Sequence, residues 1–498
     1  MKNSKKIFCL FLSVVMFVCS ISAAATAYCN EQKNKDVTPV VVIPGVGSSA
    51  LYLYPNTSDQ TSPLSVDSDF IGNVAKTHIV RDTLKIMAGG NVSPEIWTNK
   101  LASVIEPFTV LNFDKSGSSI LENVGIDCYW TDSLANHLEY LDSRPTAEPA
   151  VCKAICDNIG PENVWIYNYD FREDVIKDAE QLSEFIDGVK EQSGKDKVTL
   201  VGCSLGTSVL SAYIDKYNSE NDIEKAIFLD GAMQGVSIAK LFKGDLVLDS
   251  KIVSKYMSLM ASDYKGNAAD FEMIGNIFGR FDGTVNNFVS FLSEVTNEEN
   301  IGRFYTKVIL PILGNIPSLW ECIPYEDFDE CCNFMSDLGW LDKNSELSKI
   351  ITEYHGIQGR LEENLKNLEK EGVDIAIVCG YGLPGIPVTS ANANQSDMLI
   401  DTCYASFGAT VSNSGETIEN ATSADGMIDT STCRFKDSTW FLWGVQHMEF
   451  VYGTDVNDFI GKICTTDINL NIADFEKEYG YSQFTALQDG GTELKNVK

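Results

Sequence analysis

A serine stands between two glycines in the segment Gly202-Cys-Ser204-Leu-Gly206. The apolar, β-branched residues 198–201 before it predict a buried strand, and the pattern after it predicts a helix. In a strand–turn–helix of this kind the serine backbone is strained and the hydroxyl projects from the sheet, where the helix N-terminus favours negative charge. We expect Ser204 to be a nucleophile; the alternative is a Gly/Ser turn with no catalytic role.

A serine nucleophile needs a base, and a carboxylate must orient that base. Of the four histidines, only His447 follows the last expected strand, at residues 439–443. In α/β-hydrolases the chain order is serine, acid, histidine, which His447 satisfies. Two aspartates fit the acid position. We favour Asp425, because Gly426 after it permits a turn that aims the carboxylate at the histidine, and Asp429 is the alternative.

Backbone amides should stabilise the negative charge that develops on the reacting ester. Residues 39–43 predict a buried strand that runs into the glycine-containing loop 44–49. The amide of Val46 in this loop and that of Leu205, after the nucleophile, are the expected oxyanion hole. A simple strand-to-helix turn is the alternative for the loop. Together these groups predict acyl transfer from an ester to water or to an alcohol.

Buried strands alternate with amphipathic helices along most of the chain, which predicts a mainly parallel α/β sheet with its site at the carboxyl ends of the strands. Residues 236–371 interrupt this rhythm with helical patterns rich in Met and Phe, so we expect a large helical cap. The expected division is a core at 28–235 with a lid at 60–97, the cap at 236–371, a second core part at 372–465 and a polar C-terminal tail at 466–498.

Six short segments have the motifs of one known family: Val41-Val-Ile-Pro-Gly45, Tyr169-Asp-Phe-Arg172, Gly202–Gly206, Cys379-Gly-Tyr-Gly-Leu-Pro-Gly385-Ile-Pro387, Ala424-Asp-Gly426 and Gly444-Val-Gln-His447. Through these segments the chain resembles the lecithin:cholesterol acyltransferase and lysosomal phospholipase A2 family. This resemblance implies an α/β-hydrolase fold with a helical cap and activity on the acyl esters of lipids. It also favours Asp425 as the acid, implies a disulfide between Cys379 and Cys433, and makes Trp97 the counterpart of a substrate-binding tryptophan.

The N-terminal residues 1–27 have the pattern of a signal peptide. Three lysines precede an apolar run at 7–21, and Ala25-Thr-Ala27 is a small-x-small cleavage site. We expect a secreted protein; an uncleaved anchor is the alternative. An even number of cysteines remains after the leader, which favours disulfides in an oxidising compartment. No histidine stands at zinc spacing from the paired cysteines, so we expect no metal and no cofactor.

The formal net charge of −32 argues against nucleic acid as a partner and against electrostatic capture by anionic membranes. Contact with a membrane or micelle surface would therefore be apolar and made through the cap. The leading hypothesis is an exported serine esterase or acyltransferase acting on lipids. The alternatives are a carboxylesterase for non-lipid esters with the same triad, and an inactive lipid-binding protein on a hydrolase scaffold.

Overall fold

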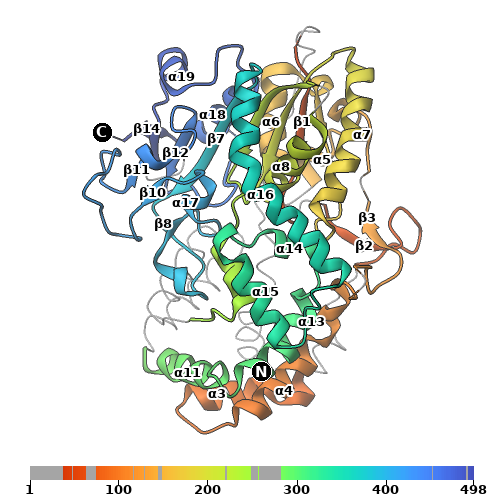
Figure 1. The fold of residues 1–498 in the computed structure, drawn as a ribbon, viewed down its shortest axis with the longest axis vertical. Coiled ribbons are helices and arrows are strands. Elements are labelled where there is room, and N and C mark those ends of the chain that lie inside the picture. Colours follow the sequence, from red (N-terminus) through yellow and green to blue (C-terminus); the bar gives the residue numbers. More distant parts are fainter. Residues whose placement is uncertain are drawn as a thin grey trace.

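The structure, a computed structural model, describes residues 37–47, 49–62, 74–115, 117–127, 129–143, 148–218, 221–247, 256, 282–450, 453–488 and 492–497. The expected signal peptide at 1–27 lies outside these residues, as does part of the expected lid. Within them the chain forms a mixed α/β structure around one large sheet (Figure 1).

The central sheet has eight described strands, and every neighbouring pair is parallel except the pair at its C-terminal end, β13 (Phe484–Leu487) with β14 (Leu494–Asn496). The strands are nearly continuous apolar runs, because both faces of the sheet are covered by helices. In spatial order they are β14 (Leu494–Asn496), β13 (Phe484–Leu487), β12 (Thr439–Trp443), β7 (Asp374–Tyr381), β6 (Ile223–Leu229), β5 (Val198–Cys203), β1 (Val40–Ile43) and β4 (Val164–Ile166).

Successive side chains of each strand enter two separate hydrophobic cores. On β1, Val41 and Ile43 face one core while Val40 and Val42 face the other, as the period of two in a strand requires. The first core contains the apolar faces of α7 (Val175–Ser193), α8 (Gly206–Tyr217) and α16 (Glu346–Lys370). The second contains those of α6 (Glu148–Ile159), α18 (Asp455–Thr465) and α19 (Ile472–Tyr479).

The expected lid and cap segments contribute helices that pack on one another. The helix α11 (Asp282–Val295) contacts both α3 (Ile79–Met87) and α4 (Pro94–Ile105). We call α3, α4 and α11 the helical lobe; it lies at the end of the molecule opposite α18 and α19 (Figure 1). The chain between α11 and α16 forms α12 (Ile301–Phe304), the π-helix η7 (Tyr305–Ile309), α13 (Leu310–Leu313), α14 (Pro317–Glu321) and α15 (Phe328–Asp337).

The remaining described elements are short. Three two-stranded antiparallel pairs are β2 (Leu51–Leu53) with β3 (Val124–Ile126), β8 (Leu383–Pro384) with β9 (Gln395–Ser396), and β10 (Thr410–Val411) with β11 (Ile428–Asp429). The short helices are η2 (Glu106–Leu111), η3 (Leu134–Asn136), α5 (Tyr140–Ser143), η4 (Pro161–Asn163), η6 (Ser237–Lys243), η8 (Tyr325–Asp327), η9 (Ser390–Ala393), α17 (Thr402–Ala405) and η10 (Thr430–Thr432).

Two boundaries differ from those expected. The segment 466–498 is more than a polar tail, because β13 pairs with β12 and β14 continues the sheet. The sequence does not reveal these strands because neither is a buried apolar run: β13 buries only Thr485 well, and β14 only Leu494. The helix α16 packs against α8 and β7, so it covers the central sheet although it falls within the expected cap.

Candidate active site

The turn around Ser204 has the strain that its sequence predicts. Ser204 joins β5 to α8 with a φ of 52°, in the left-handed region. A Cβ on Gly206 would lie 2.1 Å from the carbonyl oxygen of Ile43, and one on Gly202 would lie 3.0 Å from Gly206 O. Glycine is required at both positions because β1 and the start of α8 approach the turn so closely. The expectation of a tight, glycine-dependent turn is confirmed.

His447 reaches Ser204 from the loop that follows β12. Its Nε2 atom lies 3.0 Å from Ser204 Oγ, although 243 residues separate them. Both side chains are buried, with relative exposures of 8% for His447 and 7% for Ser204. The structure therefore brings together the two residues that the sequence singles out as nucleophile and base.

The carboxylate on His447 is Asp397, and the expectation of Asp425 at this position is wrong. Nδ1 of His447 lies 2.7 Å from Asp397 Oδ2. Because a carboxylate only accepts hydrogen bonds, Nδ1 carries the proton and Nε2 is left to accept from the serine hydroxyl. Asp397 is 1% exposed and follows β9, in the long connection between β7 and β12.

Asp425 and Asp429 stabilise turns at some remove from the imidazole. Asp425 accepts hydrogen bonds from Tyr381 Oη at 2.8 Å, Ser423 Oγ at 2.6 Å and the Met427 amide at 3.1 Å. Asp429 accepts from the Ser431 amide at 2.8 Å and caps η10. The aspartate–glycine pair at 425–426 does form a turn, but that turn satisfies its own carboxylate locally.

The backbone around Asp397 holds its carboxylate in place. Oδ1 accepts from the amides of Leu399 at 2.9 Å and Ile400 at 2.7 Å. Oδ2 is left for His447, whose own amide donates to the carbonyl oxygen of Asp397 at 2.7 Å. Met398 has a φ of 81°, which is rare for a residue with a side chain. A fixed, fully bonded carboxylate of this kind can hold one imidazole tautomer.

Gly380 on β7 allows the acid and histidine loops to meet. A Cβ there would lie 2.7 Å from Asp397 Cβ and 2.5 Å from Val445 O. Any larger residue would push one of the two loops away from the sheet.

A second buried carboxylate, Asp230, lies beside the same histidine. Asp230 follows β6 directly and is 1% exposed. Its Oδ1 accepts from the Gly380 amide at 3.0 Å and its Oδ2 from the Met448 amide at 2.8 Å. Burial, and next the charge of Asp397, raise the pKa of Asp230 to about 7 against the opposing effect of His447 and the two amides.

These carboxylates set the protonation of the imidazole. Burial on its own would lower the pKa of His447. The charge and hydrogen bond of Asp397 raise it, with smaller contributions from Asp230 and Glu148, and the net shift is upward. The imidazolium that forms when a base takes a proton is therefore stabilised at this position.

The loop after β1 lies against Ser204 on the other side. A Cβ on Gly45 would be 2.7 Å from Ser204 Cβ and 3.2 Å from its Oγ. The Gly45 amide donates to Glu148 Oε1 at 3.1 Å, and Pro44 O accepts from Tyr169 Oη at 2.7 Å. This loop is therefore pinned by buried polar groups from α6 and from the segment after β4.

Two amides beside the serine are available to a ligand. Within the described part of the chain, the amides of Val46 and Leu205 donate to no other residue. Leu205 is 1% exposed, and Val46 is half-buried. Their availability is what an oxyanion hole requires, and the engaged amide of Gly45 is excluded from that role.

Trp97 does not occupy a binding surface, contrary to expectation. It is 1% exposed in the helical lobe, where its Nε1 donates to Thr83 Oγ1 at 3.0 Å. Its ring makes edge contacts with Phe288 and Phe291 of α11, at centroid distances of 6.2 and 5.5 Å. The indole is used to pack the three helices together.

The expected disulfide between Cys379 and Cys433 is absent, and both thiols are free. Cys379 lies on the central strand β7 and approaches Trp440 O at 3.6 Å. Cys433 precedes β12 and donates to Ser406 O at 2.8 Å. Both are buried, and burial raises the pKa of each thiol above its usual value.

The described residues contain one group whose ligand atoms could hold a metal ion: Asp230, Asp397 and His447, with atoms within 4.8 Å of one another. Both oxygens of each carboxylate already accept hydrogen bonds from N–H groups. Those bonds orient the imidazole, so the donor set fits a proton-transfer site better than a metal site.

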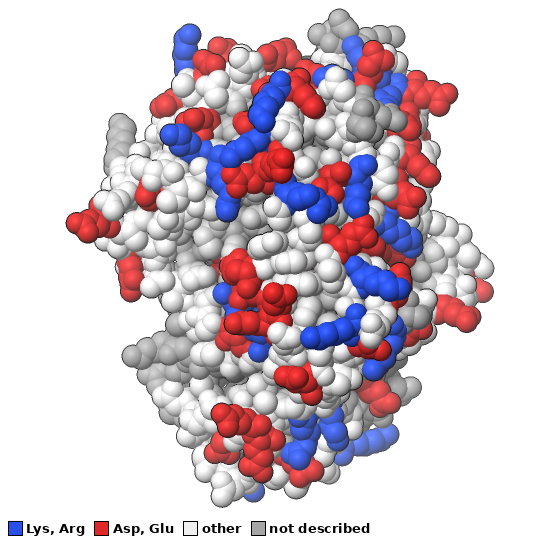
Figure 2. Space-filling model, in the orientation of Figure 1, with Lys and Arg blue, Asp and Glu red and all other residues white. Residues whose placement is uncertain are grey.

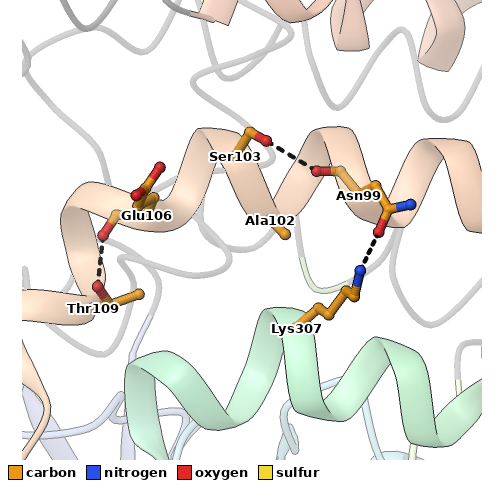
Figure 3. Close-up of a pocket in the computed structure, with 6 residues that line it drawn as sticks. All are labelled: Asn99, Ala102, Ser103, Glu106, Thr109 and Lys307. Atoms are coloured by element: carbon orange, nitrogen blue, oxygen red, sulfur yellow. Dashed lines mark hydrogen bonds between the residues drawn. The ribbon is translucent and has the colours of Figure 1, made fainter.

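A surface pocket of about 470 Å³ lies between α4 and η7 (Figure 3). Its polar side chains bond within these elements: Lys307 Nζ to Asn99 Oδ1 at 2.6 Å, Ser103 Oγ to Asn99 O at 3.1 Å, and Thr109 Oγ1 to Glu106 O at 2.7 Å. None of the residues around Ser204 lines it. We assign it no role in the chemistry.

Sequence reasoning missed Asp397, Asp230, Glu148 and Gly380. Asp230 had a usable signal, because it stands at the carboxyl end of an expected strand. Asp397 had the right chain order, between Ser204 and His447, but shares the connection after β7 with other aspartates. Glu148 and Gly380 act only through tertiary contacts that no local pattern encodes.

No protein-family model, curated protein or solved structure matches this chain. Searched over the described residues alone, the helices include none with the length and apolar character needed to cross a bilayer.

Proposed function

We propose that this protein is a serine esterase or acyltransferase of the α/β-hydrolase fold, acting on the acyl esters of lipids. The observation that carries the proposal is the hydrogen-bonded series Ser204–His447–Asp397 at the carboxyl edge of a parallel sheet. Its serine lies on a strained turn, and beside it are the amides of Val46 and Leu205, which donate to no residue that the structure describes.

The reaction follows from these positions. Ser204 Oγ attacks the ester carbonyl carbon while His447 Nε2 takes its proton, and Asp397 stabilises the imidazolium. The amides of Val46 and Leu205 hold the oxyanion. The tetrahedral intermediate collapses, His447 returns the proton to the departing alcohol, and an acyl-enzyme remains. Water or a second alcohol then attacks the acyl carbon by the same steps in reverse.

Two features support a lipid as the substrate. The segments around residues 41–45, 169–172 and 444–447 resemble those of lipid acyltransferases and phospholipases. The surface charge opposes capture of anionic partners: on the face in Figure 2, Lys and Arg lie beside Asp and Glu. On α16 these groups form ion pairs such as Arg360–Asp215, Lys366–Glu362 and Lys216–Glu353.

Docking on a lipid aggregate would therefore use apolar contact. The leader pattern at residues 1–27 supports export.

The first test concerns the chemistry. Ser204→Ala should abolish ester turnover and labelling by a fluorophosphonate while the far-ultraviolet circular dichroism is unchanged. Turnover retained by the Ser204→Ala variant would refute the proposal. Absence of labelling in the wild-type protein would instead favour an inactive, lipid-binding hydrolase scaffold.

The second test concerns the substrate. Turnover of long-chain phosphatidylcholine in vesicles is compared with turnover of a soluble short-chain aryl ester, with and without a long-chain alcohol. A lipid enzyme gains rate on the aggregated substrate, and an acyltransferase yields the ester of the added alcohol. Activity confined to the soluble ester would favour a carboxylesterase for non-lipid esters.

A further inference from the structure

The carboxylate of Asp230 forms hydrogen bonds to both β7 and the segment that carries His447. One oxygen accepts from the Gly380 amide on β7, at 3.0 Å, and the other from the Met448 amide, next to His447, at 2.8 Å. Asp230 itself has a φ of 42° and its amide donates to Val378 O at 2.9 Å. Burial of a carboxyl group and a left-handed backbone each cost free energy of folding. Packing alone does not explain why Asp230 combines both with hydrogen bonds to two separate segments.

The two amides that Asp230 binds stand at critical points. Gly380 is where the Asp397 and His447 loops approach too closely for a side chain, as its contacts show. Met448 has a φ of 56°, so the peptide after the histidine is also strained. Strained peptides hold their conformation only when the surroundings fix them. The carboxylate of Asp230 fixes both with one rigid group.

We propose that Asp230 is a positioning residue for the reaction: it locks the loop carrying His447 against β7 and, in its ionised form, adds a second negative charge beside the imidazolium. This inference rests on the proposed function, because it concerns the same histidine as a general base. Asp397 alone fixes the imidazole from the Nδ1 side. Asp230 fixes the main chain on which the ring is mounted.

The arrangement predicts different effects for the removal of each carboxylate. Asp397 contacts the ring directly, so its removal changes the tautomer. Asp230 acts through the backbone and through its charge, so its removal should leave the tautomer and loosen the geometry. Further titratable groups that interact with this cluster are Glu148 on α6, the hydroxyl of Tyr256 and the thiols of Cys203 and Cys379; burial raises the pKa values of Tyr256 and of both thiols.

The test compares Asp230→Asn with Asp222→Asn. Asparagine tolerates the left-handed backbone, but its amide nitrogen cannot accept from the second N–H group, and it carries no charge. Asp222 immediately precedes β6, as Asp230 follows it, and is 3% exposed, but it binds Tyr213 and Lys190, away from the histidine. It therefore controls for loss of a buried, bonded carboxylate next to the same strand.

We expect Asp230→Asn to lower kcat about 10- to 100-fold with KM within about 2-fold, because misplacing the base affects the transition state more than binding. The acid limb of the kcat/KM profile should move to lower pH, since a negative charge that raises the pKa of His447 is lost. Asp222→Asn should leave the limb in place. A folded Asp230→Asn variant with unchanged kcat, or with an unmoved acid limb, would overturn the inference.

A measurement on the wild-type protein covers the case in which the variant fails to fold. The amides of Gly380 and Met448 should exchange with deuterium as slowly as those inside β6; exchange as fast as that of an exposed loop would refute the lock. The proposed function fails separately, when Ser204→Ala remains active. If turnover depends on Ser204 but the Asp230→Asn variant has the kcat of the wild type, only the role of Asp230 is refuted.

Discussion

Asp397 and His447 are joined twice, once through their side chains and once through their main chains, each time at 2.7 Å. The side-chain bond selects the imidazole tautomer, and the main-chain bond sets the distance between the two loops. Because the second bond does not depend on the carboxylate, the loops should keep their places when the acid is neutralised.

Replacing the acid therefore separates Asp397 from Asp425. We expect Asp397→Asn to lower kcat by about 10³- to 10⁴-fold, because the neutral amide favours the wrong tautomer and cannot stabilise the imidazolium. Asp425→Asn, which affects a turn bonded to Tyr381 and Ser423, should change kcat less than about 3-fold. Steady-state kinetics on a soluble ester measure both. Equal losses, or a larger loss in Asp425→Asn, would return the acid role to Asp425.

The glycine after the nucleophile should be irreplaceable. Gly206→Ala places a Cβ 2.1 Å from Ile43 O, so β1 or α8 must move, at a cost of about 3 kcal/mol or more. The matched control is Gly188→Ala on α7, where the nearest atom, of the Gln192 side chain, would be 4.0 Å away. Alanine in the interior of a helix should stabilise the protein by about 0.5–1 kcal/mol. Urea unfolding of both variants gives the comparison, and a Gly206→Ala variant as stable as wild type would contradict the close contact.

Glu148 should matter for the oxyanion side of the site. Its carboxylate, 4% exposed, holds the Gly45 amide at 3.1 Å and so orients the peptide that presents Val46. Glu148→Ala should lower kcat about 10- to 100-fold, less than or similar to the loss of one oxyanion donor. Glu148→Gln keeps an oxygen acceptor and should restore most of the rate. Equal kcat values for the alanine and glutamine variants would show that the bond to Gly45 is unimportant.

The free energy of unfolding should fall as the pH rises, because a buried carboxyl group on α14, that of Glu321, bonds the first residue of α7. Glu321 is 1% exposed and accepts from the Val175 amide at 3.1 Å. Burial, followed by the charge and hydrogen bond of Asp174, raises the pKa of Glu321 well above its ordinary value of 4.5. The native state thus binds a proton that the unfolded chain has lost. The stabilisation is complete below pH 4.5 and declines as the pH rises toward the native pKa, by at most about 1.4 kcal/mol per pH unit.

Glu321→Gln removes this titration. In urea unfolding at pH 5 and pH 8, the free energy of unfolding of the variant should gain on that of wild type as the pH rises. Glu353→Gln on α16 changes an exposed carboxylate that pairs with Lys216, and it controls for the loss of one negative charge. A difference between Glu321→Gln and wild type that does not change with pH would show that Glu321 is ionised in the folded protein.

The parts of the site that the sequence predicts are those with a local signature. Ser204 is marked by glycines that the turn itself requires, and His447 by its place after the last long apolar strand. Asp397 carries no such mark: it shares one polar connection with Asp401, Asp425 and Asp429, and only the path of that connection through space decides among them. A motif resemblance favoured Asp425, whose turn forms but points its carboxylate at Tyr381.

The overall architecture was predictable for a similar reason. Buried parallel strands are long apolar runs, so six of the strands and their order with helices follow from periodicity. The short strands β13 and β14, at one end of the sheet, do not follow from periodicity, because most of their residues are only partly buried or exposed. The role of Trp97 was also beyond reach, because an indole packs between helices as readily as it lines a pocket.

The pairing of β13 with β12 has a consequence for aggregation after proteolysis. Residues 484–487 shield the strand that leads directly into His447. Proteolytic cleavage before Phe484 would leave the backbone N–H and C=O groups along one side of β12 unpaired. Such an exposed edge can pair with a strand of another molecule. Such trimming would promote aggregation even though Ser204, Asp397 and His447 would all remain in the chain.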